Sequence, residues 1–134
     1  MAQRSDHGGV GFSGAFIAVT FIIGMVLSGA PPAQAAGDPA RGETLYHGCQ
    51  ACHAIDKNGI GPMHKGVLGR ESGKVPGYEY SPALQNANLV WTEDNLDKWL
   101  TSPQKLVPGT KMFYLVKNQQ DRADIIEFLK ERAQ

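Results

Sequence analysis

The sequence contains little cysteine and has no excess of charge of either sign. Cys49 and Cys52 are the only two cysteines in 134 residues, so a zinc site would need histidine ligands, and the histidines outside this pair are not at finger-like spacing. Its 13 Lys and Arg residues balance 13 Asp and Glu residues, which gives a formal net charge of zero. Without a basic surplus, nucleic-acid binding and a strongly polycationic surface are both disfavoured.

The first 36 residues have the composition of a secretory signal peptide. Arg4 precedes an apolar run from Val10 to Ala30, and Ala33-Gln34-Ala35 follows as an A-x-A cleavage signal. We therefore expect residues 1–36 to be removed, with cleavage near Ala35 or Ala36, and residues 37–134 to form one domain in the periplasm. The alternative is an uncleaved anchor, because a run of this length can just cross a bilayer at about 1.5 Å per residue.

The two cysteines belong to the pentapeptide Cys49-Gln50-Ala51-Cys52-His53, which matches the attachment signature of a c-type haem. The thiols form thioethers with the porphyrin, and the adjacent imidazole can then serve as an axial ligand of the iron. A thioredoxin-like redox pair, half of a zinc site and a structural disulfide are the alternatives. A thioredoxin-like pair would follow a strand, whereas residues 39–48 have a helical pattern. A covalent haem also suits a domain of about 100 residues, which is small for a self-sufficient core.

The mature chain is expected to be all-α, with helices at both ends and a long irregular middle. Asp38 is a good N-cap for the first helix, and Thr92 is a good N-cap for a middle helix that ends before Pro103. A last helix is predicted from Asp121, where apolar residues recur at helical spacing. Residues 54–80 are rich in Gly, Pro and Lys without a helical period, which predicts a loop wrapped around a cofactor. Two short segments complete the pattern, a helix over 81–88 and an extended or turning stretch over 104–112.

A haem iron that only shuttles electrons needs a sixth ligand, and a methionine thioether raises the potential by favouring ferrous iron. Outside the leader the sequence has two methionines, Met63 and Met112. A methionine is more often core filler than a ligand, but Met112 lies in a turn-forming segment, residues 108–112, well separated from His53. Met63 follows His53 so closely that reaching the opposite face of the ring is difficult. We therefore expect Met112 to be the second ligand.

Together these motifs resemble those of class I cytochromes c, of the exported bacterial cytochrome c2/c550 kind, over residues 37–130. The resemblance implies the small all-α cytochrome c fold, in which the terminal helices cross and a middle helix and long loops wrap a covalent haem. Beyond the attachment motif, the matching segments are Gly61-Pro62, Gly69-Arg70, Pro76 to Ser81, Trp91, Pro103, Pro108 to Met112, and two helix-crossing pairs, Gly42 with Tyr46 and Ile125 with Phe128.

The resemblance also implies roles for individual residues. Cys49 and Cys52 hold one covalent haem c, and His53 and Met112 bind its iron. The Pro62 carbonyl accepts the other ring N–H of His53, which fixes the ring and strengthens it as a ligand. The remaining cofactor-binding residues are Arg70, Tyr80 and Trp91 on the propionate side and Thr110 in the methionine loop.

Three positions depart from the family pattern. His64 stands where the family usually has leucine, and we interpret it as an edge histidine with one side against the haem. Trp99 stands where a tyrosine often bonds the ligand sulfur. It can donate only through its indole N–H, and we interpret it as a packing residue. The segment after Met112 lacks the usual glycine and is one residue shorter.

The expected function is one-electron transfer in the periplasm by a monomeric carrier that is not an enzyme. Its partners would be membrane or periplasmic redox proteins: a cytochrome bc1-type donor, a terminal oxidase, a reaction centre or a dehydrogenase. Exposed lysines around the haem-covering loops would steer an acidic partner, namely Lys65, Lys105, Lys111 and Lys117. Three alternatives stay open: a dedicated acceptor of one periplasmic dehydrogenase in sulfur or methanol oxidation, a haem enzyme or gas sensor with a labile sixth ligand, and a carrier tethered to the membrane by its leader.

Overall fold

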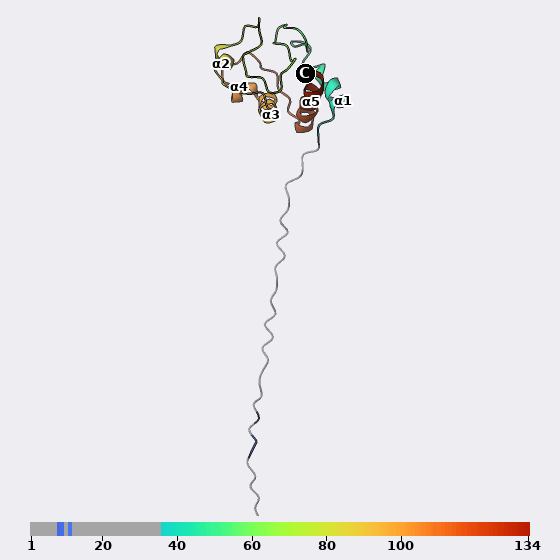
Figure 1. Cartoon of the computed structure of the whole chain (residues 1–134), viewed down its shortest axis with the longest axis vertical. Coiled ribbons are helices and arrows are strands. Elements are labelled where there is room, and N and C mark those ends of the chain that lie inside the picture. Colours follow the sequence, from blue (N-terminus) through green and yellow to red (C-terminus); the bar gives the residue numbers. More distant parts are fainter. Residues whose placement is uncertain (1–7, 10, 12–35) are drawn as a thin grey trace, which may run out of the picture. The chain divides into compact units, whose positions relative to one another are not determined.

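The computed structural model of the protein describes residues 36–134 together with Gly8, Gly9 and Gly11. The expected signal peptide therefore lies almost wholly outside the described residues. In the described part of the chain there are no strands, and an isolated antiparallel bridge joins Glu71 to Val90. This confirms the all-α fold predicted from the sequence. The helices are α1 (Pro39–Tyr46), α2 (Pro82–Gln85), α3 (Glu93–Thr101), α4 (Pro103–Leu106) and α5 (Gln119–Arg132), as Figure 1 shows.

Two of the expected helix starts are set by local capping. The side chain of Asp38 accepts hydrogen bonds from the amides of Ala40 and Arg41, and Pro39 takes the first helical position of α1. Thr92 Oγ1 accepts from the amide of Asn95 at 3.2 Å and so begins α3. Because these contacts join residues three or fewer positions apart, the sequence alone was sufficient to predict them.

Three details of the helices differ from the sequence-based expectation, and the first is that α2 ends at Gln85 rather than at Asn88. Helix α5 begins at Gln119, two residues before Asp121, because the Asn118 side chain accepts from the Asp121 amide at 3.0 Å and acts as the cap. A short helix, α4, covers Pro103–Leu106 and so overlaps the start of the stretch 104–112, which was expected to be extended or turning. Ser102 is extended and Pro103 follows it at the first helical position, so a single turn begins there. Four residues are too few for a hydrophobic period to show in the sequence.

The terminal helices α1 and α5 lie side by side, as Figure 1 shows. Gly42 of α1 is buried at the contact, where a Cβ atom would overlap the backbone carbonyl of Asp124 and approach the Phe128 Cβ within 2.8 Å. Tyr46, one turn further along α1, packs on Phe128 with ring centroids 4.9 Å apart. The crossing predicted from these residues is confirmed, and glycine is required in it because any side chain would separate the two backbones.

A buried carboxylate ties the two terminal helices together at their polar edge. The Asp124 side chain is 1% exposed, and it accepts hydrogen bonds from the Asp38 amide at 2.8 Å, from Gln120 at 2.9 Å and from the Arg41 guanidinium. Arg41 also pairs with Asp121. Burial raises the pKa of Asp124, but the hydrogen bonds from Asp38, Gln120 and Arg41 outweigh it, and the pKa is lowered overall. The ionised carboxylate is therefore the form that the fold stabilises.

The irregular segment between α1 and α2 is held by specific bonds rather than by a helix or a sheet. Asn58 donates to the Pro76 carbonyl at 3.0 Å and accepts from the Met63 amide at 3.0 Å, so it ties two loops together. Further along, the amide of Trp91 donates to the Arg70 carbonyl at 2.9 Å.

Among the described residues no helix has the length and apolar character needed to cross a bilayer.

Replacing Asp124 by Asn is expected to weaken the dependence of the free energy of unfolding on pH in the acid range. A carboxyl whose pKa is lowered by folding stabilises the protein above its unfolded pKa, and this contribution is lost as the pH falls through the folded pKa. Denaturant titrations at a series of pH values from neutral to acid measure the loss. Asp56→Asn, at an exposed position, is the control. In this variant the free energy of unfolding should fall with pH as it does in the unaltered protein. If Asp124→Asn loses as much unfolding free energy on acidification as the unaltered protein, the expectation is contradicted.

Candidate functional site

The described part of the chain encloses a cavity of about 430 Å³, within the size range of cofactor sites. The cavity lies between the attachment pentapeptide and the loop around Pro62 on one side and α3 with the segment 110–114 on the other. The structure brings all the residues predicted for cofactor and iron binding to its wall: Cys49, Cys52, His53, Pro62, Arg70, Tyr80, Trp91, Thr110 and Met112.

The first wall of the cavity holds His53 in one orientation. A tight turn follows α1, in which the amide of His53 donates to the Cys49 carbonyl at 2.9 Å. The ring atom Nδ1 lies 2.7 Å from the Pro62 carbonyl oxygen, so Nδ1 carries the proton and Nε2 keeps a free lone pair. Gly61 is required beside it, because a Cβ atom there would approach Nδ1 within 2.6 Å. Burial lowers the pKa of His53 although the Pro62 bond opposes this effect, so the ring is neutral and able to donate to a metal.

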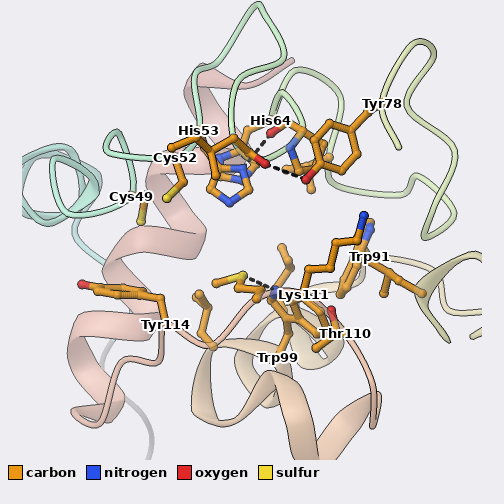
Figure 2. A pocket seen from close by; sticks show the side chains of 18 of the residues that line it. Cys49, Cys52, His53, His64, Tyr78, Trp91, Trp99, Thr110, Lys111 and Tyr114 are labelled. Carbon is orange, nitrogen blue, oxygen red and sulfur yellow. Dashed lines mark hydrogen bonds between the residues drawn. The ribbon is translucent and has the colours of Figure 1, made fainter. Parts of the chain in front are cut away.

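The two cysteines stand beside His53 at the same wall, as Figure 2 shows, and their sulfurs are free. Burial, with a smaller effect from Cys52, raises the pKa of the Cys49 thiol to about 11. A thioredoxin-like pair works through a thiolate and needs the opposite shift. The structure therefore disfavours the redox-pair alternative, and both cysteines line an apolar space.

Across the opening from His53, Figure 2 shows Trp99 and Thr110. The Trp99 indole N–H donates to the Met112 sulfur at 3.2 Å, and its ring meets Trp91 edge-on with centroids 5.2 Å apart. Gln104 of α4 donates to the carbonyls of Thr110 and Met112, at 2.6 Å and 3.3 Å, and so fixes the loop that carries the sulfur. The interpretation of Trp99 as a packing residue is thus incomplete, because it packs and also holds Met112.

A half-buried cation at the cavity wall has a buried donor without an acceptor. Arg70 donates through its terminal nitrogens to the carbonyls of Met63, at 3.2 Å, and Lys65. Its Nε–H is buried and has no partner in the described part of the chain. Because a buried unpaired donor is costly, an anionic group in the cavity would satisfy it. Tyr80 and Trp91, which also line the cavity, are both at most 9% exposed.

Sequence reasoning gave no cofactor role to several residues that line the same cavity. Ile60, Phe113 and Tyr114 are exposed large apolar residues, at 78%, 75% and 51% of their surface. Two of them follow Met112 directly, and an apolar run beside a ligand loop is the signal that could have indicated them. His64 is half-buried, lines the cavity and contacts the ring of His53.

These features together fit a flat apolar macrocycle with an iron centre and acidic side groups. The wall supplies two thiols for covalent bonds, a neutral imidazole with a free lone pair, a thioether across the opening and an unpaired guanidinium N–H. No other cofactor class that we considered from the sequence uses all of these groups.

Comparison with known proteins gives the same result. The family model described as cytochrome c matches residues 39–133. The chain is 45% identical over 112 residues to cytochrome c2 of Rhodomicrobium vannielii, a match that covers 81% of this chain and 90% of the relative. It is 49% identical over 104 residues to cytochrome c2 of Rhodopila globiformis, covering 75% of this chain and 94% of the relative.

The structure is similar to a solved one, cytochrome cH from Methylobacterium extorquens. The TM-score is 0.70 at 44% sequence identity, over 72% of this chain and 100% of the other. The chain is therefore an electron carrier rather than an enzyme, it holds a single haem c at a Cys-x-x-Cys motif, and it belongs to the class I cytochrome c family.

Proposed function

We propose that this chain carries one electron on a haem bound through Cys49 and Cys52, with His53 Nε2 and Met112 Sδ as the iron ligands. The observation that carries the proposal is the arrangement of one cavity. One wall has the two thiols beside a neutral imidazole, and at the opposite wall the Met112 sulfur accepts a hydrogen bond from Trp99. When bound, the haem supplies a one-electron iron couple. The protein does no bond-making chemistry in this function.

The chain's own residues would set the properties of that couple. The Pro62 carbonyl accepts a hydrogen bond from His53 Nδ1–H and thereby fixes the tautomer that leaves Nε2 free. Arg70, with its unpaired Nε–H, is the group best suited to bind a haem carboxylate. Tyr80 and Trp91 line the same cavity and would bind on the same propionate side. Thr110 is buried, and Gln104 holds its carbonyl. Thr110 and Gln104 would keep the ligand loop closed over the cavity and exclude water from it.

Replacing Met112 by Ala tests the ligand assignment. We expect the ferric protein to lose the weak far-red sulfur–iron charge-transfer band, the ferrous protein to bind CO at neutral pH, and the potential to fall. The free energy of unfolding should fall by roughly 2–5 kcal/mol, the usual loss for Met→Ala at a packed site. Met63→Leu, at the other methionine of residues 37–134, should retain the band. A band that survives in Met112→Ala would refute the assignment, and ready CO binding by the unaltered protein would favour a labile sixth ligand.

Replacing Trp99 by Phe is expected to lower the reduction potential while the far-red band remains. The indole N–H draws electron density from the Met112 sulfur at 3.2 Å, which weakens its donation to ferric iron and so favours the ferrous state. Phenylalanine keeps an aromatic ring against Trp91 but has no donor. A spectroelectrochemical titration measures the potential, and a denaturant titration separates lost packing from the lost bond. An unchanged or raised potential would contradict the role of this hydrogen bond.

We also propose that residues 1–36 are a cleaved signal peptide and that the mature protein works in the periplasm. The support is the A-x-A sequence after an apolar run, together with the similarity to bacterial cytochromes c2. N-terminal sequencing of protein from its native host should start near Ala36 or Gly37. A sequence that starts at Met1 or Ala2 would show that the leader is retained, as the membrane-tethered alternative requires.

As a cytochrome c, the chain must exchange electrons with redox partners, and we propose that these are membrane or periplasmic proteins with an acidic docking face. Exposed apolar residues at the cavity wall, among them Ile60 and Phe113, would form the contact. Lys111 is exposed at this rim, and three further lysines are exposed: Lys65 before α2, Lys105 in α4 and Lys117 before α5. Such cations steer an acidic partner and raise the association rate at low ionic strength. A bc1-type complex, a reaction centre, a terminal oxidase and a dehydrogenase all remain candidates under this proposal.

A further inference from the structure

We propose that His64, held by a hydrogen bond from Tyr46, is a positioning residue that sets the orientation of the His53 ring. The proposal rests on the proposed function, in which His53 is an iron ligand. His64 stands where the family pattern has leucine, so the device belongs to this chain rather than to the attachment motif. It connects the ligand to the crossing of the terminal helices.

The contact between the two imidazoles is face to face. Their ring centroids lie 4.3 Å apart and the planes differ by 19°. Figure 2 shows both rings on the same side of the opening. The bond from His53 Nδ1 to the Pro62 carbonyl fixes one atom of the ring but leaves the plane free to turn about the line that joins the two atoms. A flat side chain against the face removes that freedom, because any turn of the His53 plane would meet the ring of His64.

His64 is itself fixed from the backbone and from its side chain. Its amide donates to the Ala54 carbonyl at 2.9 Å, and its carbonyl accepts from the Val67 amide at 2.8 Å. Its Nδ1 lies 2.9 Å from the Tyr46 hydroxyl. The two backbone bonds fix the main chain at His64, and the bond from Tyr46 holds its ring.

The protonation states agree with a donor Tyr46 and an acceptor His64. Burial, with a smaller effect from Cys49, raises the pKa of Tyr46 to about 12, so the phenol keeps its proton and acts as the hydrogen-bond donor. With the Tyr46 hydroxyl as donor, His64 Nδ1 accepts the hydrogen bond and the ring proton is on Nε2.

Tyr46 brings the helix crossing into contact with the ligand. It is 1% exposed, and its ring packs on Phe128 of α5 at 4.9 Å. Its hydroxyl reaches His64 across 18 positions of sequence. A leucine at position 64 could fill space beside His53, but it has neither a flat face nor an acceptor for Tyr46. The pair thus transmits the position of the helix crossing to the plane of the ligand ring.

The experiment compares His64→Leu, Tyr46→Phe and the double variant with the unaltered holoprotein. Haem-methyl hyperfine shifts in the proton NMR spectrum of the ferric protein report the orientation of the axial ligand planes. We expect His64→Leu to change the spread of these shifts and to raise the potential, because a polar ring beside the iron is replaced by an apolar side chain. Tyr46→Phe should change the spread less, and the double variant should equal His64→Leu, since the hydroxyl acts only through His64. His47→Leu, which removes an exposed imidazole, should leave shifts and potential unchanged.

Unchanged methyl shifts in both single variants, with only a lower unfolding midpoint, would overturn the positioning role and leave His64 as a packing residue. Additive effects in the double variant would overturn the path from Tyr46 through His64. Tyr46→Phe removes one oxygen from a packed ring, so it still decides the question if His64→Leu does not assemble. Failure of the proposed function is separate: the unaltered ferric protein would then lack a low-spin spectrum with His and Met ligands, whatever the variants do.

Discussion

The fold is built around a space that its own side chains do not fill. The segment between α1 and α2 forms no helix or strand, and the cavity of about 430 Å³ lies where a larger domain would have its core. Buried apolar side chains of α3 and α5 line this space, among them Leu96, Trp99 and Ile125, so the domain gains a complete core only with an apolar group inside it. In a class I cytochrome c that group is the haem, and holding the cofactor and completing the fold are one process.

The two walls of the cavity are supported by different parts of the chain. His53 is oriented by Pro62 and contacts His64, and through Tyr46 this wall is joined to the pair of terminal helices. Met112 is held by Trp99 of α3 and, through its carbonyl, by Gln104 of α4. A change in the helix crossing therefore acts first on the imidazole wall, and a change in α3 or α4 acts first on the thioether wall. The redox couple would respond to both.

Much of the fold was predictable because its signals are local. The caps at Asp38 and Thr92 and the attachment pentapeptide each involve a few adjacent residues, and the resemblance located Met112 and Arg70 at the site. The contacts that complete the site are not local. The bond from Tyr46 to His64 joins a helix to a loop, and the bond from Trp99 to Met112 depends on how α3 faces the segment after Pro108. No periodicity or short motif indicates such contacts, so Trp99 was interpreted only as a packing residue and the bond from Tyr46 to His64 was not predicted.

The central claim is that this domain assembles around one macrocycle bonded to Cys49 and Cys52. Peptide mass spectrometry of protein matured in its native host tests it most directly, because the fragment that contains both cysteines can be weighed by itself. We expect that fragment to carry the mass of a single haem, with no free thiol. A folded protein whose fragment has the bare polypeptide mass, with both thiols free or joined as a disulfide, would contradict the claim.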